Sequence, residues 1–250
     1  MAIIVLEHGE SAGCRRLGAT LRDHGHRLRV IEVHDSGSVP VDLHDVDGVI
    51  SCGGPQSLQD NAPWLDREMD LLRAAHAEAL PVVGICLGSQ ILVKALGGEV
   101  GRVEGGDGGI ELGWHEVCLT DVGREDPILS GQPWRSMQVH WHREHLQTPP
   151  AGARVLACSQ RSPVQAWALG LRTYGFQYHP EVDENSVKSW AAEEPQALQE
   201  ARITIERLDE ETRRYYPAFK RLSDRLFELM ALYLMPADRR IAGLVKDLHH

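Results

Sequence analysis

Long apolar runs, paired cysteines and basic clusters are all missing from this 250-residue sequence. No apolar stretch approaches the roughly 18 residues that a membrane-spanning helix needs. The N-terminal MAIIVLEHGE also lacks the charged start and the long apolar region of a secretion signal. Five cysteines without a CxxC pair favour reduced thiols over a disulfide framework or a zinc site. We therefore expect a soluble, cytoplasmic protein that has no membrane partner.

Positive charge is also scarce. The sequence has 26 basic and 36 acidic residues, a net charge of −10, and no basic run. This balance argues against nucleic acid as a partner. A GxxxxGK[ST] phosphate-binding loop is absent as well, so we do not expect the chain to activate an acceptor with ATP in the usual way.

The first half of the sequence alternates short apolar runs with helical patterns. Short glycine or proline turns connect them, which is typical of an α/β fold: an open, mostly parallel twisted sheet with helices on both faces. Strands are expected at 2–8, 27–33, 47–54 and 81–86, and helices at 13–25, 62–80 and 88–96.

The pattern changes after Gly98. Strand-like runs follow at close spacing and predict an antiparallel extension of the sheet, at 111–120, 136–142, 154–160, 164–170 and 173–180. The glycine-rich segment 103–111 separates the two halves and is interpreted as a flexible loop.

The tail has a third pattern. Apolar residues recur at close to helical spacing from Ala197 to Met235, and Pro217 is expected to break or kink this segment into two helices. A helical cap packed on the core would explain the amphipathic stripe, and a surface for a second subunit is the alternative.

Cys86 lies in GICLG, where an expected strand turns sharply into an expected helix. Such a turn lifts the side chain above the sheet, and the helix start favours a thiolate through unpaired N–H groups and the helix dipole. Gly84 and Gly88 leave room for the strained turn and for close packing of helix on strand. The alternative is a buried cysteine that acts as a small hydrophobic residue.

A thiol nucleophile needs a base and a group that orients the base. His179 follows a strand-like run, and Glu181 lies two positions on, where an extended chain directs both side chains to the same side. A surface histidine–glutamate pair is the alternative. His140 and His142 share a strand face, but no matching carboxylate or cysteine set accompanies them in the sequence, so we predict no metal site.

An acyl-transfer site also needs donors for an oxyanion. SCGGPQS, from Ser51 to Ser57, supplies a glycine turn at the end of the third expected strand. Bare backbone at Gly53 and Gly54 could approach a substrate closely there.

Three motifs, CGGPQS, GICLGSQ and GFQYHPE, occur in the order found in class I (triad) glutamine amidotransferases, and the sequence resembles this family from about Ala2 to Val182. It looks most like the free-standing, GMP-synthase-like or γ-glutamyl-peptidase-like members. The resemblance implies a flavodoxin-like sheet, an amidotransferase domain over 1–190, and a helical extension over 191–250 packed on the core.

The resemblance also implies roles for single residues. Cys86 is similar to the family nucleophile, His179 to the general base and acid, and Glu181 to the residue that orients the histidine. Other positions resemble the oxyanion-hole donors and the substrate-binding residues, namely Gly54 and Leu87 for the former and Gln90, His142 and Arg143 for the latter. HWHREHL departs from the forms common in the family, which leaves side-chain roles at 140–145 open. No cofactor is implied.

Three functions follow from the resemblance. The first is hydrolysis of the γ-glutamyl amide of glutamine or of a γ-glutamyl compound through a Cys86 thioester. The second is a glutaminase subunit that delivers ammonia to a separate synthase, with the tail helices as a docking surface for the synthase or for a second copy. The third is a non-catalytic binding module of the same fold. The sequence does not identify the leaving amine.

Overall fold

The computed structural model describes residues 1–36, 38–103 and 109–235. The strands are β1 Ala2–Glu7, β2 Leu28–Glu32, β3 Val46–Ser51, β4 Val82–Ile85, β5 Glu99–Arg102, β6 Glu111–Leu119, β7 Arg135–His142, β8 Glu144–Thr148, β9 Arg154–Cys158, β10 Ala166–Leu169 and β11 Thr173–Phe176. The helices are α1 Arg15–Asp23, α2 Val33–Ser36, α3 Leu65–Ala77, α4 Leu87–Ala95, α5 Asp121–Glu125, α6 Glu184–Glu193, α7 Pro195–Glu200 and α8 Ile205–Leu229.

A nine-stranded sheet forms the centre of the molecule, in the order β2-β1-β3-β4-β11-β10-β9-β6-β7. The first five strands of this order are parallel, and the other four are antiparallel to their neighbours. The predicted parallel sheet and its antiparallel extension are both confirmed. A separate two-stranded sheet, β5 with β8, was not expected from the sequence.

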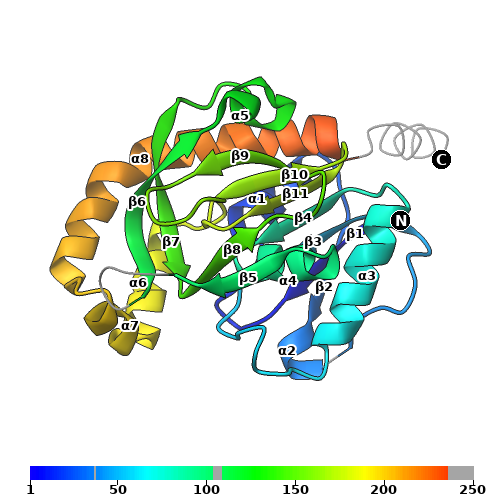
Figure 1. The fold of residues 1–250 in the computed structure, drawn as a ribbon, viewed down its shortest axis with the longest axis horizontal. Coiled ribbons are helices and arrows are strands. Elements are labelled where there is room, and N and C mark those ends of the chain that lie inside the picture. Colours follow the sequence, from blue (N-terminus) through cyan, green and yellow to red (C-terminus); the bar gives the residue numbers. More distant parts are fainter. Residues whose placement is uncertain (37, 104–108, 236–250) are drawn as a thin grey trace, which may run out of the picture.

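Helices cover both faces of the parallel strands (Figure 1). Alternate residues of β1 point to opposite sides, as the period of a strand requires: Ile3 and Val5 join a core with α1 and the end of α8, whereas Ile4 and Leu6 join a core with α3 and α4. The carboxyl ends of β3, β4 and β11 therefore meet at one edge of the sheet.

The tail folds differently from the prediction at Pro217. Helix α8 continues without a break through this proline, so the expected division at this point is wrong. Proline removes one backbone donor and leaves the carbonyl of residue 213 without its helical partner. Arg213 and Pro217 are both exposed, so water can take that place. The break lies earlier, between α7 and α8, where Arg202 has a φ of 54°.

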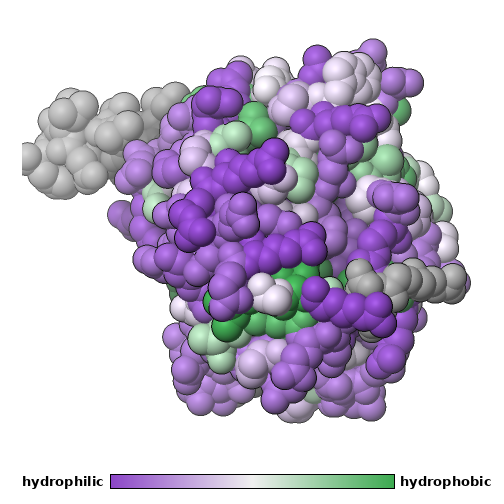
Figure 2. Space-filling model, turned by 90° about the vertical axis from the view of Figure 1, so that its left-hand side faces the viewer, coloured by the Kyte–Doolittle hydropathy of each residue, from purple (hydrophilic) through white to green (hydrophobic). Residues whose placement is uncertain are grey.

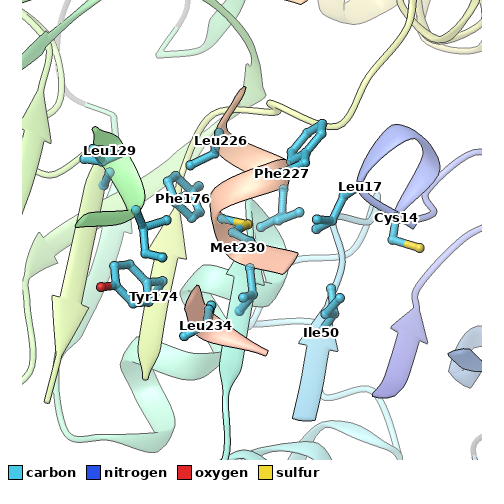
Figure 3. Packing of buried hydrophobic residues seen from close by; sticks show 14 of the residues in the cluster. Cys14, Leu17, Ile50, Leu129, Tyr174, Phe176, Leu226, Phe227, Met230 and Leu234 are labelled. Atoms are coloured by element: carbon cyan, nitrogen blue, oxygen red, sulfur yellow. The ribbon is translucent and has the colours of Figure 1, made fainter. Parts of the chain in front are cut away.

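The C-terminal helices share a core with the strands. Figure 3 shows Leu226, Phe227 and Met230 packed between Phe176 and Leu17. A further cluster joins side chains of α6, α7 and α8 to β6 and β7. The boundary expected at residues 190 and 191 falls inside α6, so the helical segment adds to the core of the sheet. The segment 103–111, expected to be a flexible loop, lies mostly outside the described residues.

Hydrophilic residues cover most of the face seen in Figure 2, and a small hydrophobic area lies in its lower half. Among the described residues, no helix is both long and apolar enough to cross a membrane.

Candidate active site

Cys86 lies at the turn between β4 and α4, where its φ is 50° and its ψ is −110°. A positive φ in a residue other than glycine costs roughly 1–3 kcal/mol and is retained where the surroundings enforce it. A Cβ on Gly88 would lie 2.1 Å from the carbonyl oxygen of Ser51, and one on Gly84 2.7 Å from Cα of Ser89. Only glycines let helix and strand approach this closely, so the predicted sharp turn at Cys86 is present.

His179 and Glu181 follow β11, and both are buried. The Nδ1 of His179 lies 2.7 Å from Oε1 of Glu181. Burial alone would lower the pKa of His179, but the charges of Glu181 and Cys86 and their hydrogen bonds outweigh it and raise the pKa to about 10. The imidazole is therefore protonated at neutral pH and lies between the carboxyl group of Glu181 and the sulfur of Cys86.

Cys86 and His179 meet above Gly53. A Cβ on Gly53 would lie 2.8 Å from Cε1 of His179 and 3.6 Å from Cβ of Cys86. Because Nδ1 of His179 binds Glu181, Nε2 is left for the thiol. The Nε2 of Gln177 lies 3.8 Å from the Cys86 sulfur. Gln177 stands in the quoted GFQYHPE motif, but no role was predicted for it.

The two backbone N–H groups predicted to bind an oxyanion are those of Gly54 and Leu87. Leu87 is the first residue of α4, so its N–H has no partner within the helix. The Gly54 backbone lies against Leu87, since a Cβ on Gly54 would come within 3.0 Å of Cδ2 of Leu87. Neither N–H donates a hydrogen bond to another described group. Their role as oxyanion donors stays a prediction.

A cleft of about 230 Å³ opens beside Cys86, Leu87 and Gly54. We call it the cysteine-side cleft, and its charged walls carry both signs: Asp60, Arg102, Arg143, Glu144 and Glu194. Gln90 also lines it, but its Nε2 donates to the Glu144 carbonyl at 2.9 Å and so holds the cleft wall. The Arg143 side chain is 42% exposed and pairs with Glu194 at 3.6 Å and with Glu200 at 2.9 Å.

His142 lines the same cleft, but its side chain is 2% exposed and contacts buried groups. Its Nε2 lies 3.3 Å from Oε2 of Glu111 and 3.2 Å from Nδ1 of His140. The prediction that no carboxylate accompanies the two histidines is wrong, because Glu111 is the cross-strand neighbour of His142 in β6 and β7. Burial lowers the pKa of His142 to about 3, so the imidazole stays neutral.

The side chains of Glu111, His140 and His142 lie close enough together to hold a divalent cation such as Zn²⁺, which takes nitrogen and carboxylate ligands. Gln165 and Ser159 donate to the same Glu111 carboxylate at 3.1 Å each, so a hydrogen-bond network already satisfies it. The prediction of no metal site stays a prediction.

A second buried histidine–glutamate pair supports the glycine turn. His8, at the end of β1, binds Glu68 of α3 at 2.8 Å through Nε2. Its Nδ1 faces the carbonyl oxygens of Cys52 at 3.1 Å and Gly53 at 3.3 Å. Ser51 donates to the other Glu68 oxygen at 2.6 Å. This pair was not predicted from the sequence, although a glutamate on the apolar face of the 62–80 helix was a usable signal.

A sequence model of the family described as glutamine amidotransferase class-I matches residues 13–190. The glutamine amidotransferase-like protein YfeJ of Salmonella typhimurium is 30% identical over 203 residues, which cover 79% of this chain and 82% of the relative. The glutamine-hydrolyzing GMP synthase of Aeropyrum pernix is 39% identical over 135 residues, covering 54% of this chain but 24% of the relative. The chain thus spans about a quarter of the length of that synthase.

Solved structures have the same fold. A glutamine amidotransferase from Thermotoga maritima superposes with a TM-score of 0.80 over 93% of this chain and 98% of its own, at 24% identity. A glutamine amidotransferase from Methylobacillus flagellatus gives a TM-score of 0.78 over 91% of this chain and 93% of its own, at 25% identity.

Proposed function

Because the chain belongs to the class I glutamine amidotransferase family, we propose that it hydrolyses the γ-glutamyl amide bond of glutamine or of a γ-glutamyl compound and releases glutamate. One observation carries the proposal: a thiol at a strained turn, beside a buried imidazole that a carboxylate orients. This arrangement is that of a covalent acyl-transfer site.

The reaction begins with attack of the Cys86 sulfur on the γ-carbonyl carbon. The carbonyl oxygen becomes negative and binds the N–H groups of Gly54 and Leu87. As the C–N bond breaks, His179 gives its proton to the departing nitrogen, and the glutamyl group stays on Cys86 as a thioester.

Water completes the cycle. His179, now neutral, takes a proton from a water molecule, whose oxygen attacks the thioester carbon. The C–S bond breaks, glutamate leaves, and the thiolate returns beside the protonated imidazole. Glu181 keeps the imidazole in one tautomer and one orientation throughout, through the hydrogen bond at Nδ1.

The glutamyl part of the substrate belongs in the cysteine-side cleft. An α-amino group needs a carboxylate and an α-carboxylate needs a cation or backbone donors, and this cleft has walls of both signs. In this arrangement His142 supports the wall through Glu111, and Gln90 supports it through the Glu144 carbonyl.

The test is glutamate release by the purified chain from glutamine and a panel of γ-glutamyl compounds, beside a Cys86→Ala variant. We expect turnover by the wild type and none by the variant. Trapping of a glutamyl thioester by mass spectrometry would identify the nucleophile directly. Release that survives the substitution would rule out this mechanism, and a wild type that releases nothing, even with a synthase present, would favour a binding module.

A second candidate function is a glutaminase subunit that delivers ammonia to a separate synthase. The similarity to a glutamine-hydrolyzing GMP synthase subunit of Sulfolobus acidocaldarius favours it, at 33% identity over 147 residues and 70% of that relative. In that case glutamate release depends on a separate synthase chain together with its acceptor substrate. Substantial release by the isolated chain would favour independent hydrolysis.

A further inference from the structure

A second cavity, of about 340 Å³, opens on the His179 side of the active site. It shares Gly53, Gly54, His179 and Glu181 with the catalytic group. We call it the acidic pocket, and its outer walls are Glu10, Ser11, Trp141, Trp190, Glu193 and Glu194. Since His179 is the proposed proton donor to the departing nitrogen, the pocket begins where the leaving group emerges.

The charges in the acidic pocket have one sign. Among the described residues, its lining has four glutamates and one basic side chain, His179, which Glu181 already engages. The cysteine-side cleft differs, because Arg102 and Arg143 line it together with carboxylates. The two cavities therefore suit two different ligand parts, one that carries both charges and one that is positive.

Ser11 holds one of the outer carboxylates in place, and Arg15 donates to the Ser11 carbonyl. Ser11 donates from Oγ to Glu193 at 2.6 Å, and Trp190 donates from Nε1 to the Ser11 carbonyl at 3.1 Å. Glu10 makes no ion pair among the described residues. Among the outer glutamates of the pocket that the structure describes, Glu194 is the one that pairs with an arginine, Arg143, at 3.6 Å. Two of the four carboxylates, those of Glu10 and Glu193, thus make no ion pair among the described residues.

A buried carboxylate oxygen of Glu181 also contributes to the negative charge of the acidic pocket. Glu181 is 3% exposed and lines the pocket, and its Oε2 has no hydrogen-bond partner among the described residues. The oxygen is itself closed to solvent, so it adds negative charge behind the pocket wall without offering a ligand a direct contact.

Two tryptophans add a surface that favours cations. The rings of Trp141 and Trp190 lie 5.7 Å apart at 60°, and Trp190 also packs against His179 at 4.8 Å. Aromatic faces attract ammonium groups, and tryptophan does so best.

We propose that the acidic pocket binds the leaving amine and that this amine carries a second, protonated nitrogen. The substrates are then γ-glutamyl amides of diamines or polyamines. This proposal rests on the proposed function and names its substrate class. In the reaction the amide C–N bond breaks, the departing nitrogen takes the proton of His179, and the distal ammonium stays among the carboxylates of Glu10 and Glu193.

The experiment compares three substrates of matched length, the γ-glutamyl amides of diaminobutane, butylamine and aminobutyrate, together with glutamine. Their distal ends are positive, neutral and negative. We expect kcat/KM to fall in that order, by about tenfold for each loss of positive charge. Equal rates for the first two, or a preference for the third, would overturn the proposal and leave the proposed function intact if glutamine or any γ-glutamyl amide is still hydrolysed.

A double variant, Glu10→Gln with Glu193→Gln, tests the residues themselves. We expect the kcat/KM ratio of the diaminobutane to the butylamine substrate to fall by at least about fivefold. A matched Glu210→Gln variant, which changes an exposed glutamate of α8, should keep the wild-type ratio. An unchanged ratio in the double variant would also overturn the proposal, and loss of all turnover in the wild type, glutamine included, would overturn the proposed function with it.

Discussion

Two of the buried histidine–glutamate pairs among the described residues, His179–Glu181 and His8–Glu68, have different surroundings. His179 binds Glu181 at 2.7 Å, and His8 binds Glu68 at 2.8 Å. In both, burial opposes the charged imidazole but the glutamate outweighs it and raises the pKa of the histidine. His8 and Glu68 are 0% exposed, whereas His179 and Glu181 line a cavity.

The remaining polar atoms of the two pairs show what the difference means. The second nitrogen of His8 faces backbone carbonyls, and the second oxygen of Glu68 accepts from Ser51. That network is complete, so it fixes the glycine turn. The second nitrogen of His179 is left for Cys86, and the second oxygen of Glu181 has no partner among the described residues. An incomplete pair beside a cavity fits the proposed exchange of protons with a substrate.

The largest effect is expected when each histidine is replaced. In a His179→Asn variant kcat should fall by about 10³-fold or more, because the acid and base of the reaction is lost. His8→Asn should keep most of kcat per folded molecule but lower the melting temperature. Steady-state kinetics and thermal unfolding of both variants measure the two quantities. If His8→Asn matched His179→Asn in kcat without loss of stability, the distinction between the pairs would be wrong.

The next effect concerns stability. Glu68→Ala removes the acceptor of both His8 and Ser51 inside the core, and breaking a buried pair costs roughly 3–5 kcal/mol of unfolding free energy. Arg67→Ala, on the exposed side of the same helix, is the control and should stay within about 0.5 kcal/mol. Denaturant titrations give both values. A cost for Glu68→Ala as small as that of the control would mean that the pair does not hold the turn.

The sequence predicts one of these pairs and misses the other for a physical reason. Glu181 lies two residues from His179 on an extended chain, so a local pattern brings their side chains together. Glu68 and His8 are 60 residues apart and meet only because α3 packs over the end of β1. Glu111 was missed likewise, since only the register of β6 and β7 places it opposite His142.

The tail illustrates the limit of a local rule. Pro217 is unfavourable inside a helix by about 3 kcal/mol. Burial of Tyr216 and Phe219 on the inner face of α8 favours an unbroken helix across that position. Tertiary packing of this kind is not visible in the sequence around a single proline. Apart from the short helix α2, the strand and helix order of the first half was predictable because each element has its own periodicity and its own glycine or proline boundary.

The pH dependence of kcat/KM distinguishes the His179–Glu181 pair from the His8–Glu68 pair. The His179 pKa is raised to about 10, so the proton that it gives to the leaving amine is present through neutral pH and lost as the pH rises through about 10. Its contribution to stability has the same sign: it is full below the unfolded value of about 6.5 and disappears on the same alkaline limb. In Glu181→Gln we expect the alkaline limb of kcat/KM to move to lower pH, because the carboxylate that holds the proton is gone.

Rate measurements from about pH 6 to the alkaline limit check this shift, with Glu68→Gln as the matched control. The control removes the carboxylate of the His8–Glu68 pair, which lines no cavity named above, and should leave the alkaline limb in place. A limb that moves equally in both variants, or in neither, would show that Glu181 does not set the proton affinity of His179.

The smallest effect is expected at an exposed pair. Arg143 binds Glu194 and Glu200 with a side chain that is 42% exposed, and such pairs contribute at most about 1 kcal/mol. If the resemblance is right that residue 143 presents backbone to the substrate, Arg143→Gln should raise KM for glutamine by no more than about threefold, and salt should weaken the effect further. A rise of tenfold or more at low and high salt alike would place the guanidinium itself on the substrate carboxylate. KM at two ionic strengths therefore decides whether the cysteine-side cleft binds its charged ligand through this side chain or through its backbone.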